Sequence, residues 1–332
     1  MSTGARPDAR YIALSGGIGG AKLCVGLAHL LGDRLTVIVN TGDDFEHLGL
    51  SISPDIDTVL YTLAGLANPD TGWGRRDETW TFMRALEGLG GPAWFKLGDG
   101  DLATHVERTR RLRSGETLTR ITEHLARKLG VVPHILPMCD RPLRTVLDTD
   151  QGTLAFQDYF VREQCRPAVT AIRFDGAAAA RPTPQILAAL ADPSLAGIIV
   201  CPSNPWLSVD PLLAVPGLRA ALRAPGVPIV AVSPIVAGQA IKGPTAKIMA
   251  ELGLQPTLAV IADHYAGVID GLLINSGDKA AAEGLLIPAH AAPAIMRTTE
   301  DKVVLARHCL DFLMQLTPSI AATRQPARRA PS

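Results

Sequence analysis

Four aspartates in the stretch "NTGDDFEHLGLSISPDIDTVLYTL" are the residues best suited to chemistry, namely Asp43, Asp44, Asp55 and Asp57. Carboxylates beside a phosphate need a hard cation between them, and Mg²⁺ takes one or two protein carboxylates together with phosphate oxygens. Asp55 has a simpler interpretation, as support for the start of the helix in "SPDIDTVLYTL". Asp57 is the candidate for ligand or metal contact, while Asp43 and Asp44 belong either to the same site or to an ordinary turn.

The glycine-rich stretch "SGGIGGAK", residues 15–22, lies between an apolar run and a helical pattern. It fits neither common phosphate-binding signature. Lys22 stands at the sixth position of GxGxxG, and Ala21 and Leu23 replace the last glycine and the hydroxyl of the Walker loop. Glycines after a strand still allow backbone N–H groups to face an anion at a helix N-terminus, where Lys22 would add a positive charge. The alternative is a tight strand-to-helix turn without a ligand.

A third polar stretch, "FKLGDGDLATH", we expect to form a glycine-broken loop. It carries Lys96, Asp99, Asp101, Thr104 and His105. So many polar residue types in a non-repetitive loop favour function over packing. The basic run that follows, residues 108–113, is interpreted as a solvated helix face.

The stretch "CPSNPW", residues 201–206, follows another buried apolar run. Its Ser203 and Asn204 can hydrogen-bond a nucleotide or its phosphates. "VSPIVAGQAIKGP" follows a further run and could close the same crevice. Polar groups at the ends of several strands therefore converge on one edge of the predicted sheet.

Strand-like and helix-like segments alternate along most of the chain. "YIALS" and "LTVIVN" flank the helical "AKLCVGLAHLL", and "AGIIVCPSN", "VPIVAVSPI" and "LAVIADHY" are interpreted as buried strands. Helices are expected at Pro211–Arg223 and Thr245–Leu252. This order predicts an α/β fold with a Rossmann-like open, mostly parallel sheet and helices on both faces.

The middle of the chain breaks this alternation. Residues 75–129 are mostly helical in pattern, and "LRTVLDTDQGTLAFQDYFVRE" predicts an antiparallel hairpin turning at Asp150–Gly152. We therefore predict a Rossmann-like core at 10–74 and 166–315, with 75–165 inserted as a mainly helical and hairpin cap. Residues 1–9 and 316–332 are predicted to be disordered tails.

Composition limits the partners. The chain of 332 residues carries 32 basic and 32 acidic side chains, so no net field favours nucleic acid or an anionic membrane. Its five cysteines are scattered without a CxxC pair, which disfavours zinc and disulfides. No apolar run is long enough to span a membrane, and the first residues lack the apolar core of a signal peptide. A cytoplasmic protein is expected.

Together these stretches resemble the CofD family of phospholactate transferases in cofactor F420 biosynthesis. The matching blocks are "SGGIGGAK", "VNTGDD", "SPDIDTVLYTL", "GWGRRDETW", "LGDGDLATH", "ILPMCDRP", "FQDYFV", "PSNPWLSV", "VSPIVAG" and "KGPTAKIM". They run in family order from about residue 11 to residue 275. Ten ordered blocks make the resemblance specific.

The resemblance implies a Mg²⁺-dependent transferase. Its donor is a guanosine diphosphate conjugate of a phosphorylated three-carbon acid. The terminal ribityl hydroxyl of the deazaflavin Fo attacks the donor phosphorus, GMP leaves, and a phosphodiester (F420-0 or a relative) forms. Cytoplasmic homodimers are the expected form.

The resemblance also assigns roles to residues. Metal ligation falls on Asp43 and Asp57, with Asp44 a weaker third. On chemical grounds, our hypothesis is that Asp57 or Asp43 also orients the attacking hydroxyl or accepts its proton. Fo contacts fall on Asp57 and Lys96, with Asp99 and His105 in the same block. The nucleotide occupies the glycine loop and the "PSNP" turn, which together provide Gly16, Gly17, Gly19, Gly20, Lys22, Ser203, Asn204 and Pro205.

Two other functions remain open on the sequence. An NAD(P)-dependent Rossmann oxidoreductase would want a small residue at position 22, which Lys22 disfavours. A non-catalytic nucleotide-binding regulator of the same superfamily would lack the blocks "PDIDT", "GDGDLATH" and "FQDYF", which this chain retains. Phospholactate, phosphoenolpyruvate and phosphoglycerate all remain candidates for the donor acid.

Overall fold

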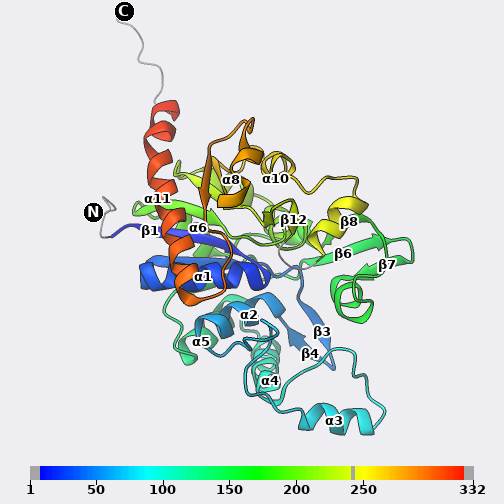
Figure 1. The fold of residues 1–332 in the computed structure, drawn as a ribbon. Helices are drawn as coiled ribbons and strands as arrows, with labels where there is room; N and C mark the ends of the chain where they lie inside the picture. The colour runs from blue at the N-terminus through cyan, green and yellow to red at the C-terminus, as the bar shows by residue number, and fades with distance from the viewer. Residues whose placement is uncertain (1–7, 241–243, 325–332) are drawn as a thin grey trace, which may run out of the picture.

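A seven-stranded sheet, parallel throughout, forms the centre of the computed structural model, which describes residues 8–240 and 244–324 (Figure 1). Its strands, in order across the sheet, are β14 (Ala289–Ala292), β13 (Gly271–Asn275), β10 (Ile229–Val232), β9 (Leu195–Val200), β1 (Arg10–Ser15), β2 (Leu35–Val39) and β5 (His134–Pro137). The strands of this sheet that come next in the sequence, β2 and β5, lie on one side of β1, and the later strands lie on the other side. The order therefore reverses between β1 and β9, and open α/β sheets bind ligands at such a point. The predicted fold class is confirmed.

Each face of the sheet is covered by helices because neighbouring residues of a strand point to opposite sides. Tyr11 and Ala13 of β1 face one apolar core, and Ile12 and Leu14 face the other. The helices of the first face are α1 (Gly17–Leu31), α2 (Pro54–Leu63), α5 (Leu118–Lys128) and α11 (Thr299–Arg324). The helices of the second face are α6 (Pro184–Leu190), α7 (Asp210–Leu213), α8 (Leu218–Arg223) and α10 (Leu258–His264).

Smaller elements lie beyond the carboxyl ends of the strands. The first group follows β2 and comprises β3 (Phe45–His47), β4 (Leu50–Ile52), α3 (Thr81–Gly88) and α4 (Asp99–Arg113). The second group is a three-stranded antiparallel sheet of β7 (Gly152–Ala155), β6 (Arg144–Thr149) and β8 (Val169–Asp175). The expected hairpin at Asp150–Gly152 is confirmed by β6 and β7. Three further elements follow β10, namely the antiparallel pair β11 (Ile235–Val236) and β12 (Gln239–Ala240), and then α9 (Thr245–Glu251).

The boundaries expected for the inserted cap do not match the sheet. β5 lies within 75–165 but pairs with β2 in the main sheet, and β8 lies beyond residue 165 but pairs with β6 in the small sheet. α5 packs into the core of the main sheet as well. The added structure therefore consists of two separate groups on either side of β5 in the sequence.

One predicted strand is wrong. "LAVIADHY" forms α10, and the neighbouring strand is "GLLIN" of β13. Thr257 starts α10 by accepting a hydrogen bond from the N–H of Val260, and the buried residues Leu258, Ile261 and Ala262 have helical spacing. The helix expected at 211–223 is divided into α7 and α8, with Gly217 at a φ of 85° directly before α8.

The ends of the chain differ from expectation in one respect. α11 continues to Arg324, so residues 316–324 are helical where a disordered tail was predicted. Cys309, Phe312 and Leu313 bury this helix against the sheet. Residues 1–7 and 325–332 of the predicted tails, and residues 241–243 of "VSPIVAGQAIKGP", lie outside the described residues. Within the described part of the chain, every helix falls short of the length and apolar character that crossing a membrane requires.

Candidate active site

The glycine loop is a very short connection at the reversal point of the sheet. Only Gly16 separates β1 from α1, and its N–H donates to the hydroxyl of Ser203, 3.1 Å away on the turn after β9. The Ser203 hydroxyl donates back to the Gly16 carbonyl at 2.7 Å. The N–H of Gly17 donates to Oδ1 of Asp55 at 2.7 Å. The N–H groups of Gly16 and Gly17 are therefore already hydrogen-bonded to side chains of the protein, although N–H groups of this loop were expected to face a phosphate.

Close packing explains three of the four loop glycines. A Cβ on Gly16 would lie 2.7 Å from the Asp55 carboxylate, and a Cβ on Gly19 would lie 2.5 Å from the Pro202 carbonyl oxygen. A Cβ on Gly20 would lie 2.6 Å from the Ser203 hydroxyl. Gly17 differs, because its φ of 63° is what favours glycine there. The loop is shaped by the need to bring β1, β9 and α2 together.

Lys22 lies on α1 beyond the loop. Its amine donates to the carbonyl of Met296, 3.3 Å away in the segment before α11. The phosphate contact predicted for Lys22 would therefore require its amine to exchange this carbonyl for the phosphate.

Asn40, directly after β2, joins two buried carboxylates. Its side-chain amide donates to Oδ1 of Asp43 at 3.1 Å and to Oδ2 of Asp55 at 2.9 Å. Burial raises the pKa of Asp55 to about 6. Burial and the neighbouring charge of Asp55 raise the pKa of Asp43 well above its usual range. Asp55 was expected to support its own helix, but its carboxylate instead bridges the glycine loop and Asn40.

Asp44 is the third buried carboxylate of this group. Its Oδ2 accepts a hydrogen bond from the Ser53 hydroxyl at 2.8 Å, and its Oδ1 is buried without a hydrogen-bond partner. Burial raises the pKa of Asp44 to about 7, although the nearby charges of Arg144 and Arg108 oppose the shift. We call Asp43, Asp44 and Asp55 the donor-side carboxylates.

Asp57 lies two residues after Asp55 in the first turn of α2 and points elsewhere. Both of its oxygens accept hydrogen bonds from the guanidinium of Arg108 on α4, one of them at 3.0 Å. Arg108 also lies 3.2 Å from Nδ1 of His105, whose Nε2 lies 3.1 Å from Oδ2 of Asp101. The Tyr61 hydroxyl donates to Oδ1 of Asp101 at 2.7 Å. We call these five residues the arginine network.

Residues 99–105 of "FKLGDGDLATH" form the start of α4, and only residues 95–98 lie outside regular structure as the predicted loop would. Asp101 and His105 lie four residues apart on one face of α4. Glu78 holds the helix start, since its carboxylate accepts from the N–H groups of Gly100 and Asp101, each at 2.8 Å. Lys96 lies exposed in the segment before α4.

Asp99 has a structural role that differs from the predicted Fo contact. Its carboxylate accepts hydrogen bonds from the N–H groups of Thr81 and Phe82, each at 3.0 Å, at the start of α3. It also accepts one from the Thr79 hydroxyl at 2.5 Å. These bonds lower the pKa of Asp99 to about 2. Asp99 is therefore a helix-capping residue.

The "PSNP" turn is also held by internal bonds. Oδ1 of Asn204 accepts from the N–H groups of Trp206 and Leu207 at 3.0 and 3.1 Å, which starts the helical turn at Pro205–Val209. Its amide donates to the Thr245 hydroxyl at 3.0 Å. Ser203 and Asn204 thus connect the glycine loop to the start of α9, at the same edge of the sheet.

In the described part of the chain, one set of three side chains offers ligand atoms close enough together for a divalent cation. Asp57, Asp101 and His105 offer ligand atoms within 4.8 Å of one another. Their mixed oxygen and nitrogen donors suit a transition metal better than Mg²⁺, and Arg108 already contacts Asp57. The donor-side carboxylates offer only hard oxygens, and the unpartnered Oδ1 of Asp44 is the group that a cation would satisfy. Their oxygens suit the predicted Mg²⁺ in type, although the three carboxylates are not gathered as closely as the first set, and the predicted pair of Asp43 and Asp57 is not brought together.

Sequence reasoning missed several residues of the site. Asn40 was not singled out, although it follows a buried strand directly. Arg108 was assigned to a solvated face, yet it is fully buried. The signal was its spacing, because Asp101, His105 and Arg108 fall at intervals of four and three on one helical face. Gln157, which donates to the Asp43 carbonyl at 3.3 Å, had no such signal.

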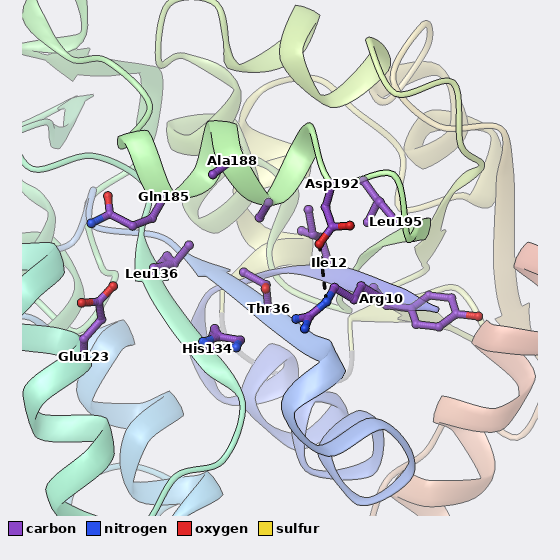
Figure 2. Close-up of a pocket in the computed structure, with 12 residues that line it drawn as sticks. Arg10, Ile12, Thr36, Glu123, His134, Leu136, Gln185, Ala188, Asp192 and Leu195 are labelled. Atoms are coloured by element: carbon purple, nitrogen blue, oxygen red, sulfur yellow. Dashed lines mark ion pairs between the residues drawn. The ribbon is translucent and has the colours of Figure 1, made fainter. Parts of the chain in front are cut away.

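A separate cavity lies at the amino ends of the strands, on the opposite side of the sheet from the glycine loop. Figure 2 shows Arg10 and Asp192 paired at 3.4 Å beside Thr36, His134 and Leu195 near the amino ends of their strands. Its volume is about 260 Å³. None of the predicted site residues lines it, so the glycine loop and the carboxylates define a different site.

Fold and site together describe an α/β protein with buried carboxylates at the carboxyl edge of a parallel sheet. A family model described as 2-phospho-L-lactate transferase CofD matches residues 12–293. The chain belongs to the CofD family of transferases.

Two relatives are similar to this chain in sequence over nearly its full length. The chain is 41% identical over 318 residues to a phosphoenolpyruvate transferase of Kitasatospora aureofaciens, covering 92% of this chain and 98% of that protein. It is 34% identical over 325 residues to a phosphoenolpyruvate transferase of Mycolicibacterium smegmatis, covering 91% and 98%.

Solved structures share the fold at low identity. A crystal structure of a UPF0052 family member from Bacillus halodurans matches with a TM-score of 0.57 at 17% identity, covering 86% of this chain and 93% of that one. A second crystal structure of the same protein, BH3568, matches with a TM-score of 0.60 at 16% identity, covering 90% of this chain and 98% of that one. At these identities the likeness concerns the fold alone.

Proposed function

We propose that this protein transfers an enolpyruvyl phosphate group from a guanosine-diphosphate-linked donor to the terminal ribityl hydroxyl of Fo, releasing GMP, in F420 biosynthesis. The observation that supports it most is the adjacency of the glycine loop and the donor-side carboxylates at the reversal point of the sheet. Full-length similarity to phosphoenolpyruvate transferases favours the enolpyruvyl acid over lactyl or glyceryl analogues.

The donor is proposed to bind along the glycine loop and the "PSNP" turn. Gly16, Gly17, Gly19 and Gly20 allow the close approach of β1, β9 and α2 there, and Ser203 ties the two connections together. Asn204 and Pro205 fix the turn that closes this edge. Lys22 would serve the donor after its amine leaves the Met296 carbonyl.

Phosphoryl transfer needs mainly in-line positioning and neutralisation of phosphate charge. When bound, Mg²⁺ supplies that neutralisation, and Asp43 with Asp44 would hold it, with Asp57 the remaining predicted ligand. The Asp43 side chain is fixed by Asn40 and its backbone carbonyl by Gln157. A carboxylate held in this way can orient the attacking hydroxyl or accept its proton.

The acceptor is proposed to bind on the side of Asp57 and Lys96. Arg108 donates hydrogen bonds to Asp57 and so fixes its orientation, and His105 of the same helix contacts Arg108. Lys96 is exposed at the start of this region. Asp99 is left out of the acceptor site because its carboxylate caps α3.

Incubation of the purified chain with Fo, Mg²⁺ and each of three guanylylated donors tests this proposal. The enolpyruvyl donor should give the fastest formation of phosphodiester and GMP, measured by mass spectrometry. One or two hydrogen bonds in the acid pocket can set such a preference. Faster turnover with the lactyl or glyceryl donor would replace the enolpyruvyl assignment. No product from any donor, together with binding of NAD(P)H, would favour an oxidoreductase.

A further inference from the structure

Arg108 is the only arginine or lysine in the described part of the chain that is fully buried. A buried guanidinium loses its hydration, and replacing a buried ion pair by apolar residues is often neutral or stabilising. Stability alone is therefore a weak reason for an arginine here. The placement of Arg108 beside the predicted site suggests a role in function.

The contacts of Arg108 fix one orientation of Asp57. Its two terminal nitrogens pair with the two oxygens of Asp57, which is the fork geometry that arginine makes with a carboxylate. Nη1 also donates to the Ser51 carbonyl at 3.4 Å, at the end of the β3–β4 hairpin. Asp57 is thus held from α4 and cannot rotate without breaking both bonds.

His105 determines how Arg108 is held. A guanidinium has only donors, so Nδ1 of His105 must accept from it and the ring N–H must lie on Nε2. Nε2 in turn faces Oδ2 of Asp101, at 3.1 Å, and Asp101 accepts from Tyr61. Asp101 lies within ion-pair distance of Nε2, which makes no hydrogen bond of its own among the described residues. The hydrogen bonds that reach Asp57 therefore run from His105 through Arg108.

The first turn of α2 sends its two aspartates in different directions. Asp55 bonds to the glycine loop, and Asp57 bonds to α4, which lies below α2 in Figure 1. Residues two apart on a helix do not share a face. One turn of helix thereby supplies a carboxylate to the donor loop and another to the opposite side of the site.

We propose that Arg108 is a positioning residue that sets Asp57 in the orientation needed by the acceptor, without touching either substrate. This inference rests on the proposed function, because it assigns the acceptor to the side of Asp57. The hydrogen bonds of Arg108 reach the site through Asp57, while its charge also acts on Asp44. A substitution that keeps the charge should therefore affect acceptor use and leave donor use nearly unchanged.

The test compares Arg108→Lys with Arg111→Lys in the full-length protein. Lysine keeps the charge at 108 but cannot form the fork. Arg111 lies three residues further on α4 and pairs with Glu107 and Glu116 away from Asp57, so it is a matched control. Arg108→Lys should lower kcat about 100-fold and raise the KM for Fo about 10-fold, since misplacement by about 1 Å can cost about that much in rate. The KM for the donor should change less than about 3-fold, and Arg111→Lys should match the unaltered protein.

A double-mutant cycle with Asp57→Asn gives the decisive result. If Arg108 acts through Asp57, the double variant should be no slower than Asp57→Asn alone, within about 3-fold. Multiplied losses, or equal effects on the KM of donor and acceptor, would overturn the proposal. If Arg108→Lys does not fold, His105→Asn takes its place in the same cycle.

A binding measurement separates this inference from the proposed function. Quenching of Fo fluorescence should report weaker Fo binding to Arg108→Lys than to Arg111→Lys. If the unaltered protein forms no product with any donor, the proposed function and this inference fall together. If it forms product and Arg108→Lys is unaffected in turnover and Fo binding, only the inference about Arg108 fails.

Discussion

The donor-side carboxylates and the arginine network lie on either side of the first turn of α2, and they solve the same electrostatic problem differently. In the arginine network, a buried guanidinium matches Asp57, and the pKa of Asp101 is lowered by its interactions with His105, Tyr61 and Arg108 although burial opposes this. The donor-side carboxylates share only neutral donors, and burial raises the pKa of each. The comparison teaches that the arginine network already contains its own positive charge, whereas the donor-side carboxylates are built to receive one.

The proposed difference between the two groups is wrong if the loss of a donor-side carboxylate changes neither turnover nor metal binding. Asp43→Asn should lower turnover about 100- to 1000-fold, because the Mg²⁺ that would neutralise the phosphate charge loses a proposed ligand. It should also weaken Mn²⁺ binding, measured by electron paramagnetic resonance. Asp148→Asn, which removes a half-buried carboxylate of β6 that pairs with Arg173 on β8, is the control and should change neither. Normal turnover in Asp43→Asn would remove this residue from the site.

Asn40→Ala tests whether the neutral donor is what keeps Asp43 and Asp55 together. Without the amide, two buried carboxylates lose a hydrogen bond each, which should lower the free energy of unfolding by about 2–3 kcal/mol. Urea unfolding in the presence of a chelator measures it. Added Mg²⁺ should recover part of the loss, since a cation can replace the donor. A loss that Mg²⁺ leaves unchanged would contradict the assignment of the metal to this group.

The raised pKa values predict how the metal-free protein depends on pH. Asp55 and Asp44, with pKa values of about 6 and about 7, bind more protons folded than unfolded between pH 5 and 7.5. The free energy of unfolding should therefore fall as pH rises through this window, by about 1–3 kcal/mol in total. Asp44→Asn should flatten the slope in a chelator. A slope of the opposite sign would show that these carboxylates are already ionised.

The smallest effect is expected inside the arginine network. Tyr61→Phe removes one hydrogen bond to Asp101 and should lower the free energy of unfolding by about 1 kcal/mol. Mg²⁺ should not recover it, in contrast to Asn40→Ala. Chemical denaturation with and without Mg²⁺ makes the comparison, and equal recovery in both variants would erase the distinction between the two groups.

The strands and the turns at their carboxyl ends were predicted well, because each of them follows from a short stretch of sequence. Buried apolar runs located β1, β2, β9 and β10, and the turns after them carry Asp43 and Ser203. "LAVIADHY" was misjudged because eight mostly apolar residues fit a strand or a helix, and the cap at Thr257 decided the outcome. The hydrogen-bond partners of the aspartates could not be predicted from the sequence. That Asp55 bonds to Gly17 and Asp57 to Arg108 depends on the packing of α2 against α1 and α4, which no local pattern encodes.

The bond between Gly16 and Ser203 joins residues 187 positions apart. During synthesis the first half of the chain, with all of its clustered aspartates, emerges before the strand that completes the site. Contacts of such long sequence separation slow folding, because the intervening chain must be ordered first. Until β9 inserts beside β1, the nascent protein has an acidic half-site that lacks the turn proposed to bind the nucleotide.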